Sequence, residues 1–358
     1  MKKVFSAIVL LIVIFLGLTG CKATSGKSET AVQKKVAIQP TQSQEDTKNS
    51  KEASASKEGT LVSVAYDSKA IADNQIEENS QCTFYIYLPP SYHESTRNYP
   101  VLYFLHGFGD SALSFASFEE LELNRIFSED PSKEFILVAI DGISSPGGSF
   151  YVNSPVTGRW EDYIVKEVVS YVDSNYRTLA DSKSRGICGY SMGGFGALNL
   201  AFLHPEVYGA VYAMSPGVLA PGKIGDALDT WEFDSSFLKS YSLAFAYTDT
   251  APYKTLPKRD GSDADNALLK RWEAGFGNWK EKLDTYLALN TPLRGIGLSY
   301  GTGDYYPWIP EGVDYLSGLL DEKGIEHTMY TFDGGHVLPP KAMEDHLLPF
   351  FQQFLIWQ

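Results

Sequence analysis

One serine of this chain has the neighbours that a nucleophilic hydroxyl needs. Ser191 lies in the sequence GYSMG at 189–193, between a short apolar run and a stretch typical of a helix. A sharp turn between strand and helix exposes the serine hydroxyl, and glycines on either side let the elements approach closely. The N–H groups at the start of the helix can then stabilise the negative charge that forms when a serine attacks a carbonyl carbon.

A second Gly-x-Ser-x-Gly pattern occurs at 297–301, around Ser299. Pro307 and Pro310 follow it, so a helix cannot begin directly behind this serine. An apolar helical stretch does follow Ser191. We therefore predict Ser191 as the nucleophile and expect Ser299 to lie at the end of a strand.

A serine nucleophile needs a base, usually a histidine that is held by a carboxylate. His336 follows the last predicted strand in a glycine-rich loop, and functional groups gather at the carboxyl ends of parallel strands. We predict His336 as the base. The other five histidines occupy other predicted positions: His93 and His106 in turns, His204 at a helix end, His327 within a strand and His346 within a helix.

Asp304 follows the predicted strand 295–300 and is the expected carboxylate. Asp333 is the alternative, but three residues before His336 it is more typical of a turn. The chain order Ser191, Asp304, His336 is the order of α/β-hydrolases, and it differs from the orders in chymotrypsin and subtilisin.

The oxyanion hole is expected to consist of two backbone N–H groups, those of Met192 and Phe108. Met192 directly follows the nucleophile, and Phe108 lies in the turn after the apolar run 101–105. Gly107 in this turn allows the backbone to approach a substrate closely. An ordinary turn at 106–107 is the alternative.

Apolar strands alternate with helical segments over most of the chain, which indicates an α/β fold with a mostly parallel sheet covered by helices on both faces. No helix separates the first two strands, so the sheet should start antiparallel. Strands are predicted at 60–66, 82–88, 101–105, 135–140, 185–189, 210–214, 295–300 and 326–332, and helices at 160–172, 193–203, 311–322 and 341–355.

The segment at about 217–290 does not fit this alternation and is rich in aromatic residues, so we predict an insertion over the site. Trp160, Tyr305 and Trp308 are expected near the pocket, where they could stack on sugar or phenolic rings. The alternative is that these three side chains belong to the core.

The first 21 residues have the pattern of a secretory signal: two lysines, an apolar run at 4–18 and the sequence LTGC at 18–21. This ending resembles the lipobox of bacterial lipoproteins, which implies a lipid anchor on Cys21 at the cell surface or in the periplasm. An ordinary signal peptide is the alternative. Residues 22–58 lack aromatic residues and are predicted to be a disordered tether, followed by a catalytic domain at 59–358.

The chain carries a net charge of −14, which argues against nucleic acid as a partner. Cys82 and Cys188 are the two cysteines of the predicted catalytic domain. We expect Cys188 to be a buried thiol, with a disulfide between the two as the alternative.

Several motifs together resemble those of the esterase D-type family, over about 80–355. They are VLYFLHG at 101–107, WEDY at 160–163, GYSMGGFGAL at 189–198 and HP at 204–205. This family includes feruloyl and acetylxylan esterases, S-formylglutathione hydrolase and mycolyltransferases. The resemblance implies an α/β-hydrolase fold, no metal or organic cofactor, and catalytic roles for the serine, aspartate and histidine predicted above.

We therefore expect a serine carboxylesterase that works through an acyl-enzyme. A tethered position outside the cytoplasm favours feruloyl or acetyl esters of polysaccharides as substrates. The alternatives are an acyltransferase to a cell-envelope acceptor and a non-catalytic binding lipoprotein, although a binding protein has no need of a complete triad. The acyl group, the alcohol and the oligomeric state are left open.

Overall fold

The computed structural model describes residues 58–231 and 233–357. The predicted signal, the lipid anchor on Cys21 and the tether up to residue 57 lie outside the described residues. A search of the described helices finds none with the length and apolar character that crossing a membrane requires.

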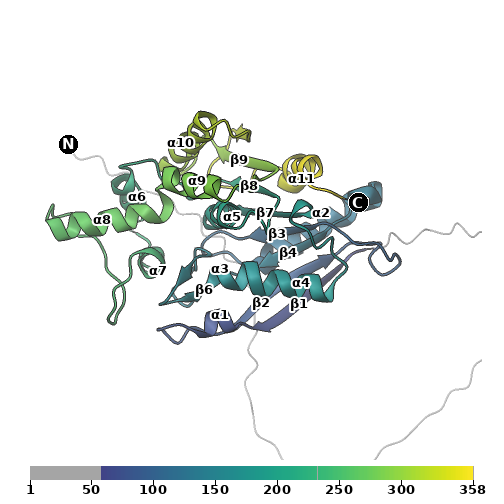
Figure 1. The fold of residues 1–358 in the computed structure, drawn as a ribbon, viewed down its shortest axis with the longest axis horizontal. Helices are drawn as coiled ribbons and strands as arrows, with labels where there is room; N and C mark the ends of the chain where they lie inside the picture. Colours follow the sequence, from purple (N-terminus) through teal and green to yellow (C-terminus); the bar gives the residue numbers. More distant parts are fainter. Residues whose placement is uncertain (1–57, 232, 358) are drawn as a thin grey trace, which may run out of the picture. The chain divides into compact units, whose positions relative to one another are not determined.

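An eight-stranded sheet forms the centre of the molecule, in the order β1-β2-β4-β3-β7-β8-β9-β10 (Figure 1). The pairs β1–β2 and β2–β4 are antiparallel, and all later pairs are parallel. The prediction of a mostly parallel sheet with an antiparallel start is thus confirmed. The strands are β1 Thr60–Asp67, β2 Gln81–Leu88, β3 Val101–Leu105, β4 Ile136–Ile140, β7 Arg185–Tyr190, β8 Ala210–Met214, β9 Gly295–Gly301 and β10 Thr328–Phe332. A small ribbon pairs β5 Asn153–Ser154 with β6 Gly158–Arg159.

Helices cover both faces of the sheet, because the central strands are apolar at nearly every position and must be buried on both sides. Alternate residues of β3 show this: Leu102 and Phe104 pack on one face, with α2 and α11, while Tyr103 and Leu105 pack on the other. The helices are α1 Lys69–Ala72, α2 Ala112–Glu129, α3 Trp160–Asp162, α4 Val169–Asn175, α5 Met192–Leu203, α6 Ile224–Trp231, α7 Ser235–Phe245, α8 Asp263–Phe276, α9 Trp279–Ala288, α10 Trp308–Glu322 and α11 Leu348–Phe354.

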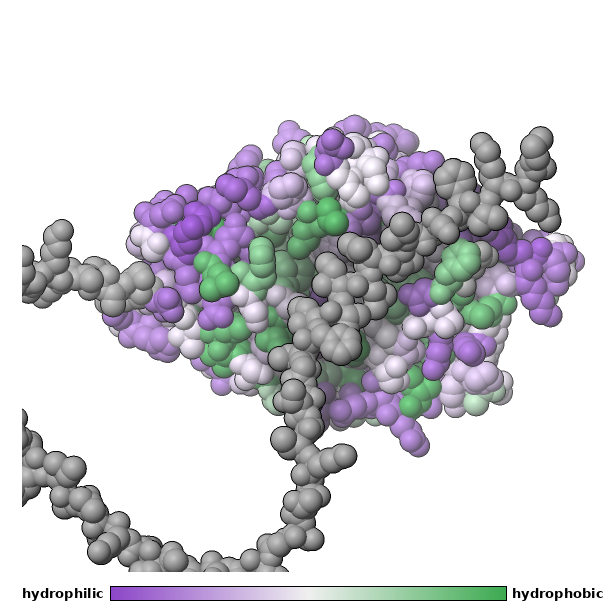
Figure 2. All heavy atoms as spheres, turned by 180° about the vertical axis from the view of Figure 1, so that it is seen from behind, coloured by the Kyte–Doolittle hydropathy of each residue, from purple (hydrophilic) through white to green (hydrophobic). Residues whose placement is uncertain are grey.

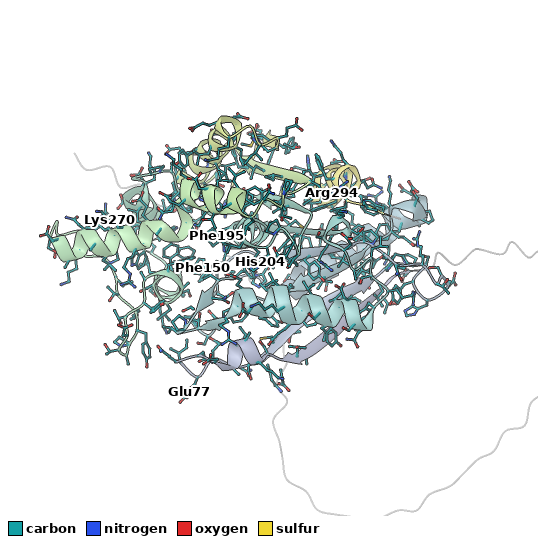
Figure 3. All side chains as sticks on the ribbon, in the orientation of Figure 1. Glu77, Phe150, Phe195, His204, Lys270 and Arg294 are labelled. Atoms are coloured by element: carbon teal, nitrogen blue, oxygen red, sulfur yellow. The ribbon has the colours of Figure 1, made fainter. Side chains whose placement is uncertain are left out.

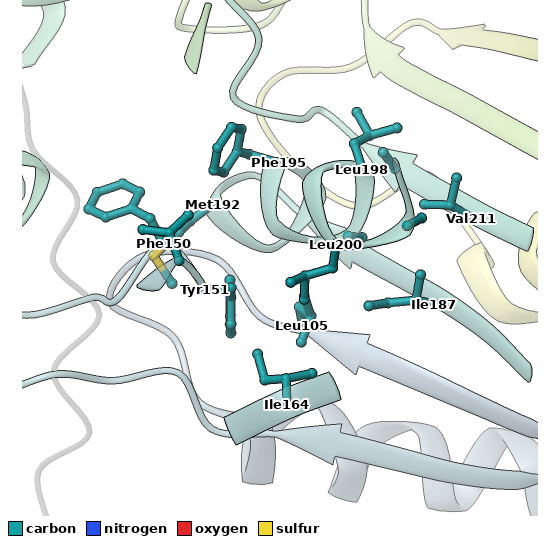
Figure 4. Close-up of a cluster of buried hydrophobic side chains, with 14 of the residues drawn as sticks. Leu105, Phe150, Tyr151, Ile164, Ile187, Met192, Phe195, Leu198, Leu200 and Val211 are labelled. Atoms are coloured by element: carbon teal, nitrogen blue, oxygen red, sulfur yellow. The ribbon is translucent and has the colours of Figure 1, made fainter. Parts of the chain in front are cut away.

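Helix α5 occupies the centre of the second face. Its Leu198 and Leu200 share one buried cluster with the strand residues Leu105, Ile187 and Val211 (Figure 4). Helix α5 follows β7 directly, so this packing fixes how the chain leaves the sheet at Ser191.

Helices α6, α7 and α8 form a lobe that extends to the left of the sheet in Figure 1. Phe276 of α8 lies 4.8 Å from Phe195 of α5 and 5.6 Å from Phe150, measured between ring centroids. Phe150 and Phe195 lie near each other at the base of the lobe in Figure 3, whereas Lys270 lies on α8 further out. An aromatic cluster therefore joins the lobe to the sheet.

The predicted insertion at 217–290 is too long at its C-terminal end. Helix α9 belongs to the layer that covers the sheet, since its Tyr286 stacks on Phe202 of α5 with a centroid distance of 5.0 Å. The partly buried Lys282 of α9 also donates to the carbonyl oxygens of Gly275 and Gly277, at 2.9 and 2.7 Å. The lobe thus ends with α8, and Lys282 ties that end to the covering layer.

The surface mixes hydrophilic side chains at the periphery with smaller hydrophobic areas (Figure 2). Two large hydrophobic side chains of α2 are exposed, Phe118 at 66% and Leu121 at 74%. The same helix carries a buried carboxyl on its inner side. Glu119 is 2% exposed, and its Oε2 has no hydrogen-bond partner among the residues that the structure describes.

Burial raises the pKa of Glu119 from 4.5 to about 8, with a smaller contribution from the negative charge of Glu122. In the unfolded chain this carboxyl ionises near its ordinary pKa. The stability that comes from burying the neutral acid is therefore complete below about pH 4.5 and is lost as the pH rises toward 8.

We expect Glu119→Gln to remove this dependence, because the amide has a similar shape and does not titrate. The melting temperature of the variant should fall less between about pH 5 and pH 8 than that of the parent chain. The control is Glu120→Gln, at the partly exposed neighbouring position, which should follow the parent profile. Parallel profiles for parent and Glu119→Gln would contradict the assignment.

Gly312 allows a test of how closely α10 packs against the backbone at Val218. A Cβ atom at Gly312 would lie 1.8 Å from the carbonyl oxygen of Val218, whereas one at Gly318 of the same helix would meet nothing within 4 Å. Gly312→Ala should destabilise the fold by about 1–3 kcal/mol, because the clash is with backbone. Gly318→Ala should be neutral or stabilising by up to about 1 kcal/mol. Urea unfolding measures both, and equal midpoints would refute the packing argument.

Candidate active site

Ser191 occupies a strained turn between β7 and α5. Its backbone has φ 56° and ψ −116°, a conformation that non-glycine residues rarely adopt. Backbone hydrogen bonds hold the turn: the Ser191 N–H donates to Met214 of β8 at 2.9 Å, and the Ser191 carbonyl accepts from Phe195 and Gly217 at 3.0 and 3.2 Å. The strain is therefore supported by neighbouring backbone on both sides.

The two motif glycines are required by close backbone contacts. A Cβ atom at Gly193 would lie 2.0 Å from the carbonyl oxygen of Leu105, and one at Gly189 would lie 2.2 Å from that of Gly193. A side chain at either position would thus force β7, β3 and α5 apart. The other Gly-x-Ser-x-Gly serine, Ser299, lies in β9 and is fully buried.

Ser191, His336 and Asp304 form one hydrogen-bonded chain. The Nε2 atom of His336 lies 2.9 Å from Ser191 Oγ, and its Nδ1 atom lies 2.8 Å from Asp304 Oδ2. The carboxylate beside the imidazole therefore belongs to Asp304 and not to the alternative, Asp333. Because a carboxylate accepts, Nδ1 carries the proton, and Nε2 is left free to accept from the serine.

The three residues come from the carboxyl ends of three strands. Ser191 directly follows β7, Asp304 lies three residues after β9, and His336 lies four residues after β10. The Asp304 side chain is completely buried, and its Oδ1 atom accepts from the backbone N–H of Tyr306 at 2.8 Å. The structure thus brings together the three residues that the sequence predicts.

Met192 and Phe108 both border the cavity beside Ser191, as an oxyanion hole requires. The buried His106 helps to orient the second donor. Its Nδ1 atom lies 2.7 Å from the carbonyl oxygen of Gly107, which can only accept, so Nδ1 donates. The Phe108 N–H belongs to the same planar trans peptide unit and points away from that carbonyl. His106 therefore fixes the direction of the Phe108 N–H.

A cavity of about 210 Å³ adjoins Ser191 and His336. Seven aromatic rings besides His336 line it, and three of them come from the lobe. The rings are Phe108, Tyr190, Trp231, Phe237, Phe276, Tyr306 and Trp308. They also contact one another, with centroid distances of 4.9 Å for Phe108 and Phe237 and 5.4 Å for Trp231 and Trp308. The cavity can therefore accommodate a flat apolar group next to the serine.

Of the three predicted substrate-contacting residues, Trp308 lines the cavity, and its indole N–H donates to Thr230 at 3.0 Å. The prediction for Trp160 is wrong. This side chain is 3% exposed, its N–H donates to the carbonyl of Thr157, and its ring packs in the core. Tyr305 does not line the cavity itself, but it is 71% exposed and its ring packs on the cavity residue Tyr306 with a centroid distance of 5.1 Å. Its contact with a substrate therefore stays a prediction.

Two tyrosines that the sequence analysis did not select flank the imidazole. Tyr190 donates its hydroxyl to the backbone carbonyl of His336 at 2.6 Å, and its ring centroid lies 5.0 Å from that of the imidazole. Tyr306 packs edge-on at the same distance. Tyr190 directly precedes the nucleophile and Tyr306 lies two residues after Asp304. Their closeness in sequence to Ser191 and Asp304 could have identified them as neighbours of the base.

Cys82 and Cys188 are both buried free thiols, and burial is the main cause that raises the pKa of each. Within residues 58–231 and 233–357, no group of three or more histidine, cysteine, aspartate or glutamate side chains is arranged to hold a metal ion.

Comparison with known proteins identifies relatives of this chain. An esterase of Mycobacterium tuberculosis (strain ATCC 25618 / H37Rv) is 34% identical over 266 residues, which covers 71% of this chain and 52% of the relative. An endo-1,4-beta-xylanase/feruloyl esterase of Xylanibacter ruminicola is 27% identical over 147 residues, covering 39% and 20% of the two chains. The chain spans about half the length of the first of these relatives and less of the second.

A solved structure of a ferulic acid esterase superposes with a TM-score of 0.59 at 20% sequence identity, covering 84% of this chain and 99% of that one. At this identity the likeness shows the fold, which is that of the α/β-hydrolases. The family model Esterase, described as "Putative esterase", matches residues 76–271, more than half of the chain. The strained serine turn, the strand-end triad and this match lead to one conclusion: the chain belongs to the Esterase family.

Proposed function

We propose that this protein is a serine carboxylesterase that forms an acyl-enzyme on Ser191. The observation that carries the proposal is the continuous hydrogen-bonded chain from Ser191 through His336 to Asp304. A strained serine turn with a base in contact is the arrangement that activates a hydroxyl for attack on a carbonyl.

The proposed reaction has two steps. His336 Nε2 takes the proton of Ser191 as Oγ attacks the ester carbonyl, and the N–H groups of Met192 and Phe108 bind the resulting oxyanion. His336 then gives the proton to the departing alcohol, which leaves the acyl group on Ser191. Water, deprotonated by His336, attacks the acyl-enzyme in the second step; the bond from the acyl carbon to Ser191 Oγ then breaks, the acid is released and His336 returns the proton to Oγ. Asp304 holds the imidazole in place and stabilises its charged form.

The aromatic cavity supports an aromatic acyl group, feruloyl before acetyl, because flat rings can stack against its walls. The relatives with feruloyl esterase in their names support the same choice. We further propose that the alcohol side of the ester is a polysaccharide. A lipid anchor on Cys21 would place the enzyme outside the cytoplasm, where such esters occur.

The proposed nucleophile is tested by assaying the full chain on 4-nitrophenyl acetate and methyl ferulate. Ser191→Ala should lower kcat by about 10³-fold or more on both esters. Ser299→Ala is the matched control, since this serine has the same local motif and lies buried in β9, and it should retain activity. Full activity of Ser191→Ala, or no labelling of the parent chain by a serine-directed phosphonate, would refute the proposal.

Tyr190 is expected to position the base through its bond to the His336 carbonyl. Tyr190→Phe removes this bond and keeps the ring, so kcat should fall about tenfold while KM changes less than about threefold, the effect of one lost hydrogen bond. Burial is the main cause that raises the pKa of Tyr190, so its hydroxyl stays protonated and the loss should be constant between about pH 6 and 9.

Tyr300→Phe is the control for this measurement, because the Tyr300 hydroxyl bonds Asp314 instead of a triad residue. It should keep the parent kcat. An unchanged kcat for Tyr190→Phe, or an equal loss in both variants, would show that the Tyr190 hydroxyl does not position the base.

A further inference from the structure

The active-site cavity is negatively charged. Two aspartates border it, Asp110 and Asp234, and no lysine or arginine is among the lining residues of the described chain. Building on the proposed function, we propose that Asp110 and Asp234 make this site select against esters whose acyl group carries a negative charge. The substrates would then be esters with an uncharged acyl group.

Both carboxylates are held in place by backbone N–H groups. Asp110 Oδ1 accepts from the N–H of Ser111 at 2.7 Å, and Asp234 Oδ1 accepts from the N–H groups of Ser236 and Phe237, both at 3.0 Å. Asp234 thereby caps the N-terminus of α7. Neither forms an ion pair with a lysine or arginine within the described ranges, so their charge is not neutralised locally.

Each charge acts on one of the two tyrosines that contact the base. After burial, the charge of Asp304 and Tyr306, Asp110 adds to the raised pKa of Tyr190. Asp234 likewise adds to the raised pKa of Tyr306, after burial and Tyr305. Because Tyr190 and Tyr306 flank the imidazole, a substrate carboxylate placed in the cavity would meet the field of both aspartates.

Like charges that border the same cavity repel, and aromatic walls screen them less than open water does. The tetrahedral intermediate adds a further negative charge next to any substrate carboxylate. The penalty should therefore appear in kcat/KM, and it should shrink with added salt because both aspartates are exposed.

The test compares two esters of similar size, 4-nitrophenyl butyrate and mono-4-nitrophenyl succinate, which differ by a terminal carboxylate. The parent chain should prefer the butyrate by at least about 30-fold in kcat/KM. In the double variant Asp110→Asn/Asp234→Asn this preference should fall at least tenfold, because the amide keeps the Oδ1 acceptor and loses the charge.

The matched control is Asp130→Asn/Asp181→Asn. These aspartates also accept from backbone N–H groups at the start of short helical turns. They precede the amino ends of β4 and β7, whereas Ser191 follows the carboxyl end of β7, so they lie at the other end of the strands. This control removes the same net charge and should keep the parent preference. An equal decrease in both double variants would assign the effect to overall charge and overturn the proposal.

Failure of the inference and failure of the proposed function give different results. Turnover of both esters with equal efficiency, lost in Ser191→Ala, would overturn the charge selection and leave the esterase intact. If neither ester is hydrolysed, the proposed function itself is overturned. An unchanged preference in Asp110→Asn/Asp234→Asn would show that the two aspartates do not set it.

Discussion

The close approach of α5 to β3 is the contact on which the rest of the site depends. Gly193 lies against the carbonyl groups of Leu105 and His106, where no side chain would fit. Leu105 ends β3 and leads into the turn with Phe108, while Gly193 follows Met192. One backbone contact therefore joins the two segments that carry the predicted oxyanion donors, directly beside the strained turn at Ser191.

The sheet positions the triad, and the lobe forms part of the cavity wall. Strand ends hold the serine, the base and its carboxylate through short backbone connections, so their geometry follows from strand pairing. The lobe of α6–α8 supplies Trp231, Phe237 and Phe276 to the cavity, and Asp234 at the start of α7. Changes in the lobe would alter which group fits the cavity without moving Ser191, His336 or Asp304.

The parts of this molecule that could be predicted from the sequence are those set by local patterns. The strands, the serine turn and the triad residues depend on apolar runs and on what directly follows them. Helix α2 was not predicted, because exposed Phe118 and Leu121 obscure its apolar face. Trp160 was misassigned because tertiary packing decides whether an aromatic side chain faces a cavity or the core. The lobe residues that line the cavity are remote from the motifs, so no local pattern indicated them.

The position of β10 has a consequence for how this protein loses activity. β10 is the last strand of the sheet, and four of its five residues are exposed or partly exposed. Edge elements open at a lower free energy than central ones. When β10 frays, His336 leaves while the serine turn beside central β7 stays formed. Such a molecule is still folded by most spectroscopic criteria, yet it has no base, so catalysis would be lost before global unfolding.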